Sequence, residues 1–165
     1  IQYAKNGIDA KITAKMNSLV DPEIIKLLYE ASQEGVKIEL IIRGMCCLYP
    51  QRKGLSENII VTSIIGRFLE HSRIFWFNND GDPEVFIGSA DWMRRNLDRR
   101  VEAVTPIEDK KIKKEIKHLL DFYLEGNKDS WNMQSDGSYT KNQILNDKKK
   151  YIQEKIIKLY KKEEN

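Results

Sequence analysis

The chain has 165 residues, a mass of 19.3 kDa and a formal net charge of +3, which together predict a single domain. Its 41% of hydrophobic residues are enough for a core, and no apolar run approaches the roughly 18–20 residues that cross a bilayer. The adjacent Cys46 and Cys47 exclude a disulfide framework and a Cys-x-x-Cys zinc site, and favour a cytoplasmic location. Because the sequence begins at Ile1 rather than at Met, we expect a piece of a longer protein.

The first part of the chain predicts a strand, a helix and a second strand. Residues 8–16 alternate apolar and polar side chains, which is typical of a half-buried strand. Asp21-Pro22-Glu23 then offers an N-cap, a proline at the first helical position and an acidic first turn, and Gly35 ends the helix. Residues 36–42 predict a buried strand. This unit favours an α/β fold with a parallel sheet and helices on its faces.

The remaining elements follow a long loop at residues 44–58. Residues 59–65 predict a third strand, residues 73–77 and 84–89 a hairpin, residues 101–105 a further strand, and residues 108–125 a helix. We expect a core over 1–126, a polar connector over 127–140 and a basic terminal helix from about 141 to 163. The lysines of that last helix are interpreted as a solvated face, with a polyanion or membrane contact as the alternative.

The arginines are concentrated in one part of the chain. All eight lie between Arg43 and Arg100, a stretch that holds only one lysine, Lys53. Arginine carries a rigid, permanently charged fork that binds phosphate or carboxylate oxygens through two nitrogens. The cluster therefore predicts an oxyanion site, and structural ion pairs with neighbouring acidic residues are the alternative.

His71 is the candidate for chemistry among the two histidines, and His118 is interpreted as structural. Strand alternation places His71 and Arg73 on one face, and the hairpin brings Ser89 and Asp91 toward them. Gly88 is expected to leave room for a ligand. An imidazole can act as a nucleophile, acid or base near neutral pH. The alternative is a partly buried histidine bonded to a nearby carboxylate.

These residues carry a resemblance to a known family. His71-x-Arg73 followed by Gly88-Ser89-Ala90-Asp91 resembles the half-site of the phospholipase D superfamily, usually His-x-Lys followed by Gly-Ser-x-Asn. Arginine in place of lysine and aspartate in place of asparagine resemble polyphosphate kinases of the long, multidomain type. Sequence blocks matching their C-terminal catalytic domain span residues 15–21, 42–48, 54–59, 66–73 and 87–102.

The resemblance implies a single phospholipase D-like domain over 1–165, with a mixed β-sheet flanked by helices and a C-terminal basic helix. It implies part of an ATP:polyphosphate phosphotransferase that reversibly transfers the γ-phosphoryl of ATP to a growing polyphosphate chain, with Mg²⁺. The phosphorylated histidine and the Mg²⁺ ligands would belong to preceding domains, so no residue here receives a metal role. The parent is expected to be a homo-oligomer that binds ATP, ADP and inorganic polyphosphate and no specific nucleic acid. It is expected in the cytoplasm, with a peripheral position at the inner face of the bacterial membrane as the alternative.

The resemblance also implies roles for individual residues. His71 matches the second family histidine and Arg43 a contact to the nucleotide phosphates, while Trp92 is interpreted as core packing. We expect His71 and Arg73 to be catalytic. The residues expected to bind ATP or phosphate are Arg43, His71, Ser89, Asp91, Arg99 and Arg100.

Two other functions remain open from the sequence. One is a phospholipase D-like phosphodiesterase in which a homodimer pairs two His71 half-sites. The other is a non-catalytic module that binds polyanions through the arginine cluster and the basic tail.

Overall fold

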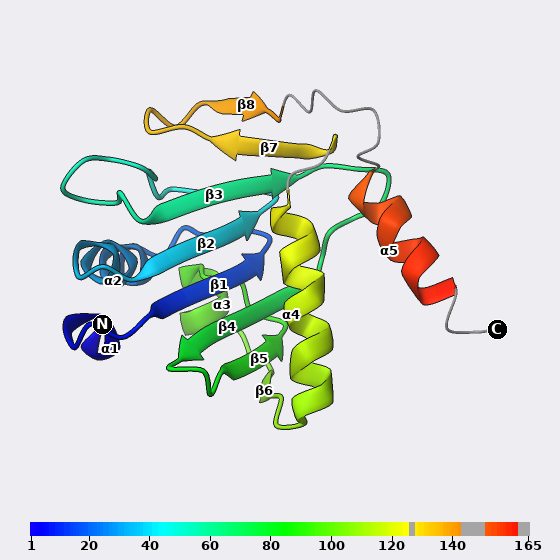
Figure 1. Ribbon diagram of the computed structural model, residues 1–165. Coiled ribbons are helices and arrows are strands. Elements are labelled where there is room, and N and C mark those ends of the chain that lie inside the picture. Colours follow the sequence, from blue (N-terminus) through cyan, green and yellow to red (C-terminus); the bar gives the residue numbers. More distant parts are fainter. Residues whose placement is uncertain (126–127, 143–150, 162–165) are drawn as a thin grey trace.

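A mixed sheet of eight strands forms the centre of the computed structural model, which describes residues 1–125, 128–142 and 151–161 (Figure 1). The strand order is β6-β5-β4-β1-β2-β3-β7-β8. The strands are β1 (Ala10–Met16), β2 (Lys37–Ile42), β3 (Ile59–Ile64), β4 (Arg73–Asn79), β5 (Glu84–Gly88), β6 (Val104–Pro106), β7 (Ser130–Met133) and β8 (Tyr139–Lys141). The helices are α1 (Gln2–Lys5), α2 (Pro22–Gln33), α3 (Arg94–Arg99), α4 (Lys110–Leu124) and α5 (Ile152–Lys161).

The middle of the sheet is the predicted β-α-β unit. β1 pairs in parallel with β2 and β2 with β3, whereas β4 runs antiparallel to β1 on its other side. The carboxylate of Asp21 accepts a hydrogen bond from the Ile24 amide at 3.0 Å and so caps α2, and Pro22 stands at its first position. Just after this helix, Gly35 adopts a left-handed φ of +87° that suits glycine. The local signals therefore place the helix as predicted.

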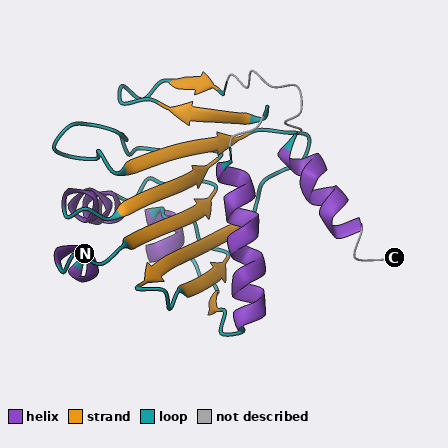
Figure 2. Cartoon of the chain, in the orientation of Figure 1, coloured by secondary structure: helices purple, strands orange, loops and turns teal. Residues whose placement is uncertain are grey.

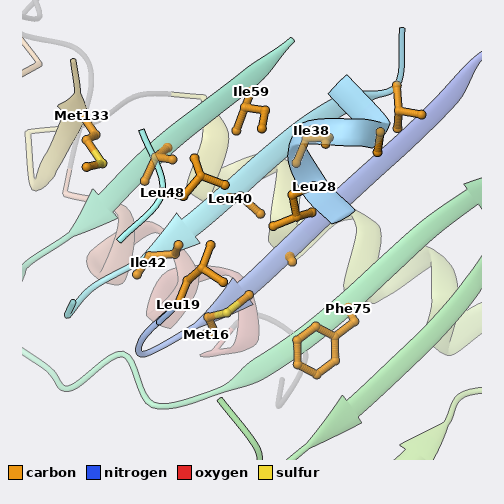
Figure 3. Packing of buried hydrophobic residues seen from close by; sticks show 14 of the residues in the cluster. Met16, Leu19, Leu28, Ile38, Leu40, Ile42, Leu48, Ile59, Phe75 and Met133 are labelled. Atoms are coloured by element: carbon orange, nitrogen blue, oxygen red, sulfur yellow. The ribbon is translucent and has the colours of Figure 1, made fainter. Parts of the chain in front are cut away.

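Each face of the sheet has its own core. Leu28 and Ala31 of α2 pack against apolar side chains of the central strands in a cluster shown in Figure 3. On the opposite face, Leu120 of α4 and Ile152 of α5 join Ile41 in a second cluster. Figure 2 shows α4 lying across the strands. Full burial of each such side chain stabilises the fold by about 1.5–3 kcal/mol, so the helices fix both faces of the central strands.

The polar connector predicted over 127–140 is wrong, because β7 and β8 form a hairpin there that extends the sheet beyond β3. Only Ser130 and Met133 of β7 are buried, so little hydrophobic alternation marks this hairpin in the sequence. Backbone pairing to β3 holds it instead, and Gly137 turns the chain with a φ of +90°. The predicted core boundary at 126 is wrong for the same reason.

Other boundaries also differ from the prediction. The terminal helix does not begin at 141, because β8 ends at Lys141, and the described helix is Ile152–Lys161. Residues 143–150 and 162–163 of that predicted helix lie outside the described residues. α3 was not predicted, and the strand expected at 101–105 is the later β6. Among the described helices, none combines the length and apolar character that crossing a membrane requires.

Candidate functional site

An open cleft of about 480 Å³ lies along the edge of the sheet that is formed by strand ends rather than by an outer strand, and we call it the arginine cleft. The parallel strands β1 and β2 both end at this edge, the antiparallel β4 begins there, and β5 ends there. Segments far apart in the sequence therefore meet at one place. The cleft is lined by Asn17, Ser18, Arg43, Met45, His71, Arg73, Ser89, Asp91, Met93, Arg95, Arg100 and Glu102.

Arg73 is held by two nitrogens against Asp91. Its Nε donates to Asp91 Oδ1 and its Nη2 to Asp91 Oδ2, both at 3.2 Å, and the two side chains are only 12% and 7% exposed. Asp91 also accepts from the Asn17 amide at 2.8 Å and the Asn17 side chain at 3.1 Å. Burial alone would raise the pKa of Asp91, but the hydrogen bonds from Arg73 and Asn17 outweigh it and leave this pKa below its usual value. The Asp91 carboxylate is therefore ionised, and it holds the Arg73 guanidinium in a fixed position.

His71 is positioned by the third nitrogen of the same arginine. Arg73 Nη1 lies 2.8 Å from His71 Nδ1 and donates to the His71 carbonyl at 3.0 Å. Because arginine can only donate, Nδ1 is the acceptor in this contact. His71 itself is exposed at the cleft. Its imidazole is thus oriented by Arg73 and open to a ligand.

Arg43 reaches the cleft from the residue after β2. Its Nε donates to Asn17 Oδ1 at 2.9 Å and to the Glu70 carbonyl at 3.1 Å. Within the described part of the chain, no hydrogen bond engages its two terminal nitrogens. The side chain is therefore anchored at Nε while two NH₂ groups stay available for an anion in the cleft.

A buried ion pair lies beneath the His71 segment, and the sequence reasoning missed it. The Lys15 side chain is 1% exposed, and its Nζ lies 3.2 Å from Glu70 Oε2 and 2.9 Å from Ser72 Oγ. Glu70 also accepts from the Tyr123 hydroxyl and from Gln153 Nε2, both at 2.7 Å. These contacts hold residues 70 and 72 on either side of His71.

Burial determines the electrostatics of this network. Desolvation lowers the pKa of Lys15, and the attraction of Glu70 offsets only part of that effect. Burial, followed by the hydrogen bond to Glu70, raises the pKa of Tyr123. Lys15 occupies a polar position of the alternating β1 pattern, so only the covering of that face by α4 and α5 reveals that it is buried.

Ser89 is engaged on the other side of the cleft. Its hydroxyl hydrogen-bonds to Glu102 and accepts from the Ala103 amide at 3.1 Å. Hydrogen bonds from Ser89 and then from Asn96 lower the pKa of Glu102. A Cβ at Gly88 would lie 2.7 Å from the Ala103 carbonyl oxygen, so this glycine accommodates the chain before β6. The need for glycine at position 88 is thus explained by chain packing, and not by the approach of a ligand, which was the prediction.

The structure brings most of the predicted site residues together, in part by other contacts than expected. Asp91 reaches His71 only through Arg73, and the described hydrogen bonds of Ser89 go to Glu102 and Ala103. Arg100 lines the cleft, as does Arg95, which was not assigned a role. Arg99 is exposed on α3 and is not among the lining residues, so its role stays a prediction.

Two further assignments concern packing. Trp92 stacks on Phe75 with ring centroids 5.2 Å apart and packs against the core, as predicted. His118 is exposed on α4 and lines a small pocket between α4 and α5. It contributes nothing to the arginine cleft.

The described residues do not form a metal site by themselves. Across 1–125, 128–142 and 151–161, no group of three or more histidine, cysteine, aspartate or glutamate side chains lies close enough to hold an ion. The two cleft carboxylates are already engaged, Asp91 by Arg73 and Glu102 by Ser89. Among the described residues, both carboxylates that line the cleft are therefore bound to protein partners rather than free to hold Mg²⁺.

Comparison with known proteins identifies the family. The family model described as polyphosphate kinase C-terminal domain 2 matches residues 1–153. The polyphosphate kinase of Prochlorococcus marinus strain MIT 9313 is 63% identical over 161 residues, which cover 97% of this chain and 23% of that protein. The polyphosphate kinase of Pseudomonas aeruginosa is 56% identical over 133 residues, which cover 81% of this chain and 19% of that protein.

Solved structures agree with these matches. The crystal structure of polyphosphate kinase from Porphyromonas gingivalis matches with a TM-score of 0.94 and 39% identity, over 99% of this chain and 25% of that chain. Nuc from Salmonella typhimurium, a phospholipase D family member, matches with a TM-score of 0.52 and 15% identity, over 84% of this chain and 87% of that chain. This second likeness concerns the fold alone, and the predicted phospholipase D-like fold is confirmed. The chain spans about a fifth to a quarter of its polyphosphate kinase relatives, and it belongs to the polyphosphate kinase C-terminal domain family.

Proposed function

We propose that this chain supplies one half of the active site of a polyphosphate kinase, which reversibly transfers the γ-phosphoryl of ATP to a growing polyphosphate chain. The observation that carries the proposal is the arrangement around Arg73, which binds Asp91 through two nitrogens and His71 through the third. An exposed imidazole is thereby fixed beside available guanidinium groups. Family membership supports ATP and polyphosphate as the substrates of the parent.

Phosphoryl transfer depends mainly on positioning and on stabilising charge at the transferred oxygens. In the proposed mechanism, the free terminal nitrogens of Arg43 bind phosphate oxygens in the cleft, together with Arg100, which also lines it. Arg73 keeps His71 oriented and adds positive charge beside it. His71 then donates or accepts a proton at its exposed ring while the phosphoryl group moves to or from a histidine in another domain.

The other parts of the proposal lie beyond this chain. We place the nucleophilic histidine and the ligands of Mg²⁺ in the remaining domains of the parent, where the ion would neutralise phosphate charge. The parent is proposed to be a homo-oligomer in the cytoplasm, with peripheral attachment to the inner face of the bacterial membrane as the alternative. Ser89 and Asp91 act in this scheme by fixing the cleft wall and Arg73, respectively.

The test compares the full-length parent with the isolated chain. We expect the parent to make polyphosphate from ATP, and the isolated chain to fold, as judged by a cooperative melt, without making polymer. Polymer synthesis by the isolated chain would contradict the division into two halves. Hydrolysis of a simple phosphodiester by the isolated chain would favour the phosphodiesterase instead. Salt-sensitive binding of polyphosphate and DNA alike, unchanged by His71→Ala, would favour a binding module.

A further inference from the structure

A second cavity lies between α4 and the β4–β5 turn, which follows the end of β4 remote from Arg73. It has a volume of about 360 Å³. Trp76 of the cavity and Arg73 of the arginine cleft are three residues apart on β4, so roughly 10 Å of extended strand separates the two linings. We call it the lysine cavity, because Trp76 and four lysines of α4 line it together with the turn. The lysines are Lys110, Lys113, Lys114 and Lys117.

The four lysines share one face of α4. Their spacing of three, four and seven residues places them as neighbours along the helix, where like charges repel. They also begin at the first residue of α4, near the helix end whose free amides already carry partial positive charge. The Asp109 cap offsets part of this charge by accepting from the Lys111 and Ile112 amides. A bound anion would relieve both the repulsion and the conflict with the helix dipole.

The protein neutralises this charge only in part. Lys117 pairs with Asp121 at 2.6 Å, while Lys113 donates to the neutral Pro83 carbonyl at 2.6 Å. Within the described residues, Lys110 and Lys114 have neither a hydrogen bond nor an ion pair. Asp82 is the one acidic residue among those that line the cavity. The cavity thus keeps a surplus of positive charge.

Trp76 provides an independent observation. Its side chain is 6% exposed, and its indole Nε1 has no hydrogen-bond partner in the described part of the chain. A buried indole N–H normally finds an acceptor, because leaving one unmade costs free energy. Trp76 lines the same cavity as the unpaired lysines. An anion bound in the cavity would provide the missing acceptor once the indole turns its buried N–H toward it.

We propose that the lysine cavity binds phosphate groups of a polyphosphate chain at a distance from the reacting end. The proposal rests on the proposed function, which makes this polyanion the product of the parent enzyme. Lysines suit the task because flexible point charges can follow a polymer that moves past them, without the fixed geometry of an arginine fork. The cavity would retain the polymer between successive additions and take no part in the chemistry.

The test measures binding of inorganic polyphosphate of one fixed length to the full-length parent. The double variant Lys110→Ala/Lys114→Ala is compared with Lys53→Ala/Lys111→Ala, which removes the same charge from residues that do not line the cavity. We expect the cavity variant to weaken binding roughly tenfold and the control to change it less than twofold. The ATP turnover of the cavity variant should match that of the wild type, while the polyphosphate that this variant makes becomes shorter. Equal weakening by both double variants, or none by the cavity variant, would overturn the proposal.

Trp76→Phe tests the indole separately, because it keeps an aromatic ring and removes the N–H donor. We expect about threefold weaker polymer binding with an unchanged salt dependence, since no charge is lost. A melting curve confirms that the variant is folded, and unchanged affinity in a folded variant would remove the indole from the site. Equally tight, lysine-dependent binding of DNA would overturn the assignment to polyphosphate. Failure of the wild-type parent to make polyphosphate would instead refute the proposed function. The turnover and product-length assays described above would reveal that failure.

Discussion

The arginine cleft and the lysine cavity hold positive charge in opposite ways. In the cleft, Arg73 is bound by a carboxylate and Arg43 by two oxygen acceptors, so each guanidinium has a fixed place. In the cavity, Lys110 and Lys114 have no partner among the described residues. Charge alone therefore does not define a reaction site. Changes that keep the charge and alter the geometry should damage the cleft and leave the cavity unaffected.

The largest effect is expected for His71→Ala in the full-length parent. Removal of a general acid or base typically costs about 10²–10⁴ in rate. Because His71 is exposed, the melting temperature should stay close to that of the wild type. Some acid-labile phosphate should still form on the upstream histidine. His118→Ala is the matched control and should retain turnover, since His118 lies outside the cleft.

The same experiment can reassign the role of His71. Loss of all phosphohistidine in His71→Ala, with the upstream histidine dispensable, would make His71 the nucleophile. Wild-type turnover in the variant would remove it from the mechanism. Only the second result would break the contrast between a reactive cleft and a binding cavity, because a nucleophilic His71 would keep the reaction in the cleft.

Lys15→Met should produce the next largest effect, on the free energy of unfolding. It leaves Glu70 charged and buried without its cation, which costs about 3–5 kcal/mol. Urea unfolding measures the loss. Lys15→Met/Glu70→Gln should recover part of it, because the stranded charge is gone. Losses that simply add in the double variant would show that the two side chains do not stabilise one another.

α2 and the β7–β8 hairpin differ in how well the sequence alone predicts them. Asp21, Pro22 and Gly35 define α2 through local chemistry, so a window of a few residues suffices. The β7–β8 hairpin has a local turn signal at Asp136-Gly137, but its strands lack one, because their pairing depends on an edge of β3 that exists only after the sheet forms. Their side chains are mostly polar, so composition alone indicated a connector.

The site shows the same division. His71, Arg73 and Asp91 are close in sequence, and a hairpin with a recognisable motif was enough to group them. The support beneath them was invisible, because Gln153 reaches Glu70 from a helix 83 residues away. The alternating pattern of β1 predicts that Lys15 is exposed, but α4 and α5 cover that face of the strand. Long-range packing, rather than local pattern, decides these contacts.

Asp91→Asn should destabilise the protein by about 3 kcal/mol at neutral pH, because it removes the anion that Arg73 faces. The folded-state pKa of Asp91 is lowered, so its contribution is fully present above the unfolded value of about 3.9. It is lost as the pH falls through the folded pKa. Urea unfolding of wild type and variant should therefore differ at pH 6 and converge in strong acid. A difference independent of pH would show that the ionised carboxylate is not the cause.

Arg43→Lys separates fork from charge within the cleft. Lysine keeps the charge but cannot be anchored at Nε while offering two further donor groups. We expect kcat/KM for ATP in the parent to fall by an amount equivalent to about 1.5–3 kcal/mol, the scale of a hydrogen bond to a charged group. Lys110→Arg is the mirror change in the lysine cavity and should leave polymer binding nearly unchanged. Wild-type kinetics in a folded Arg43→Lys variant would exclude phosphate binding through the Arg43 fork.

The smallest effect distinguishes two arginines that are neighbours in the sequence, Arg99 and Arg100. Arg100 lines the cleft and Arg99 does not, although both are exposed and carry the same charge. Exposed ionic contacts contribute about 0.2–1 kcal/mol, so Arg100→Ala should raise the KM for ATP in the parent by roughly two- to fivefold. Arg99→Ala is the matched control and should change the KM by less. A larger effect for Arg99→Ala would mean that the bound nucleotide extends over α3, and that the cleft acts over a wider surface than the residues that line it.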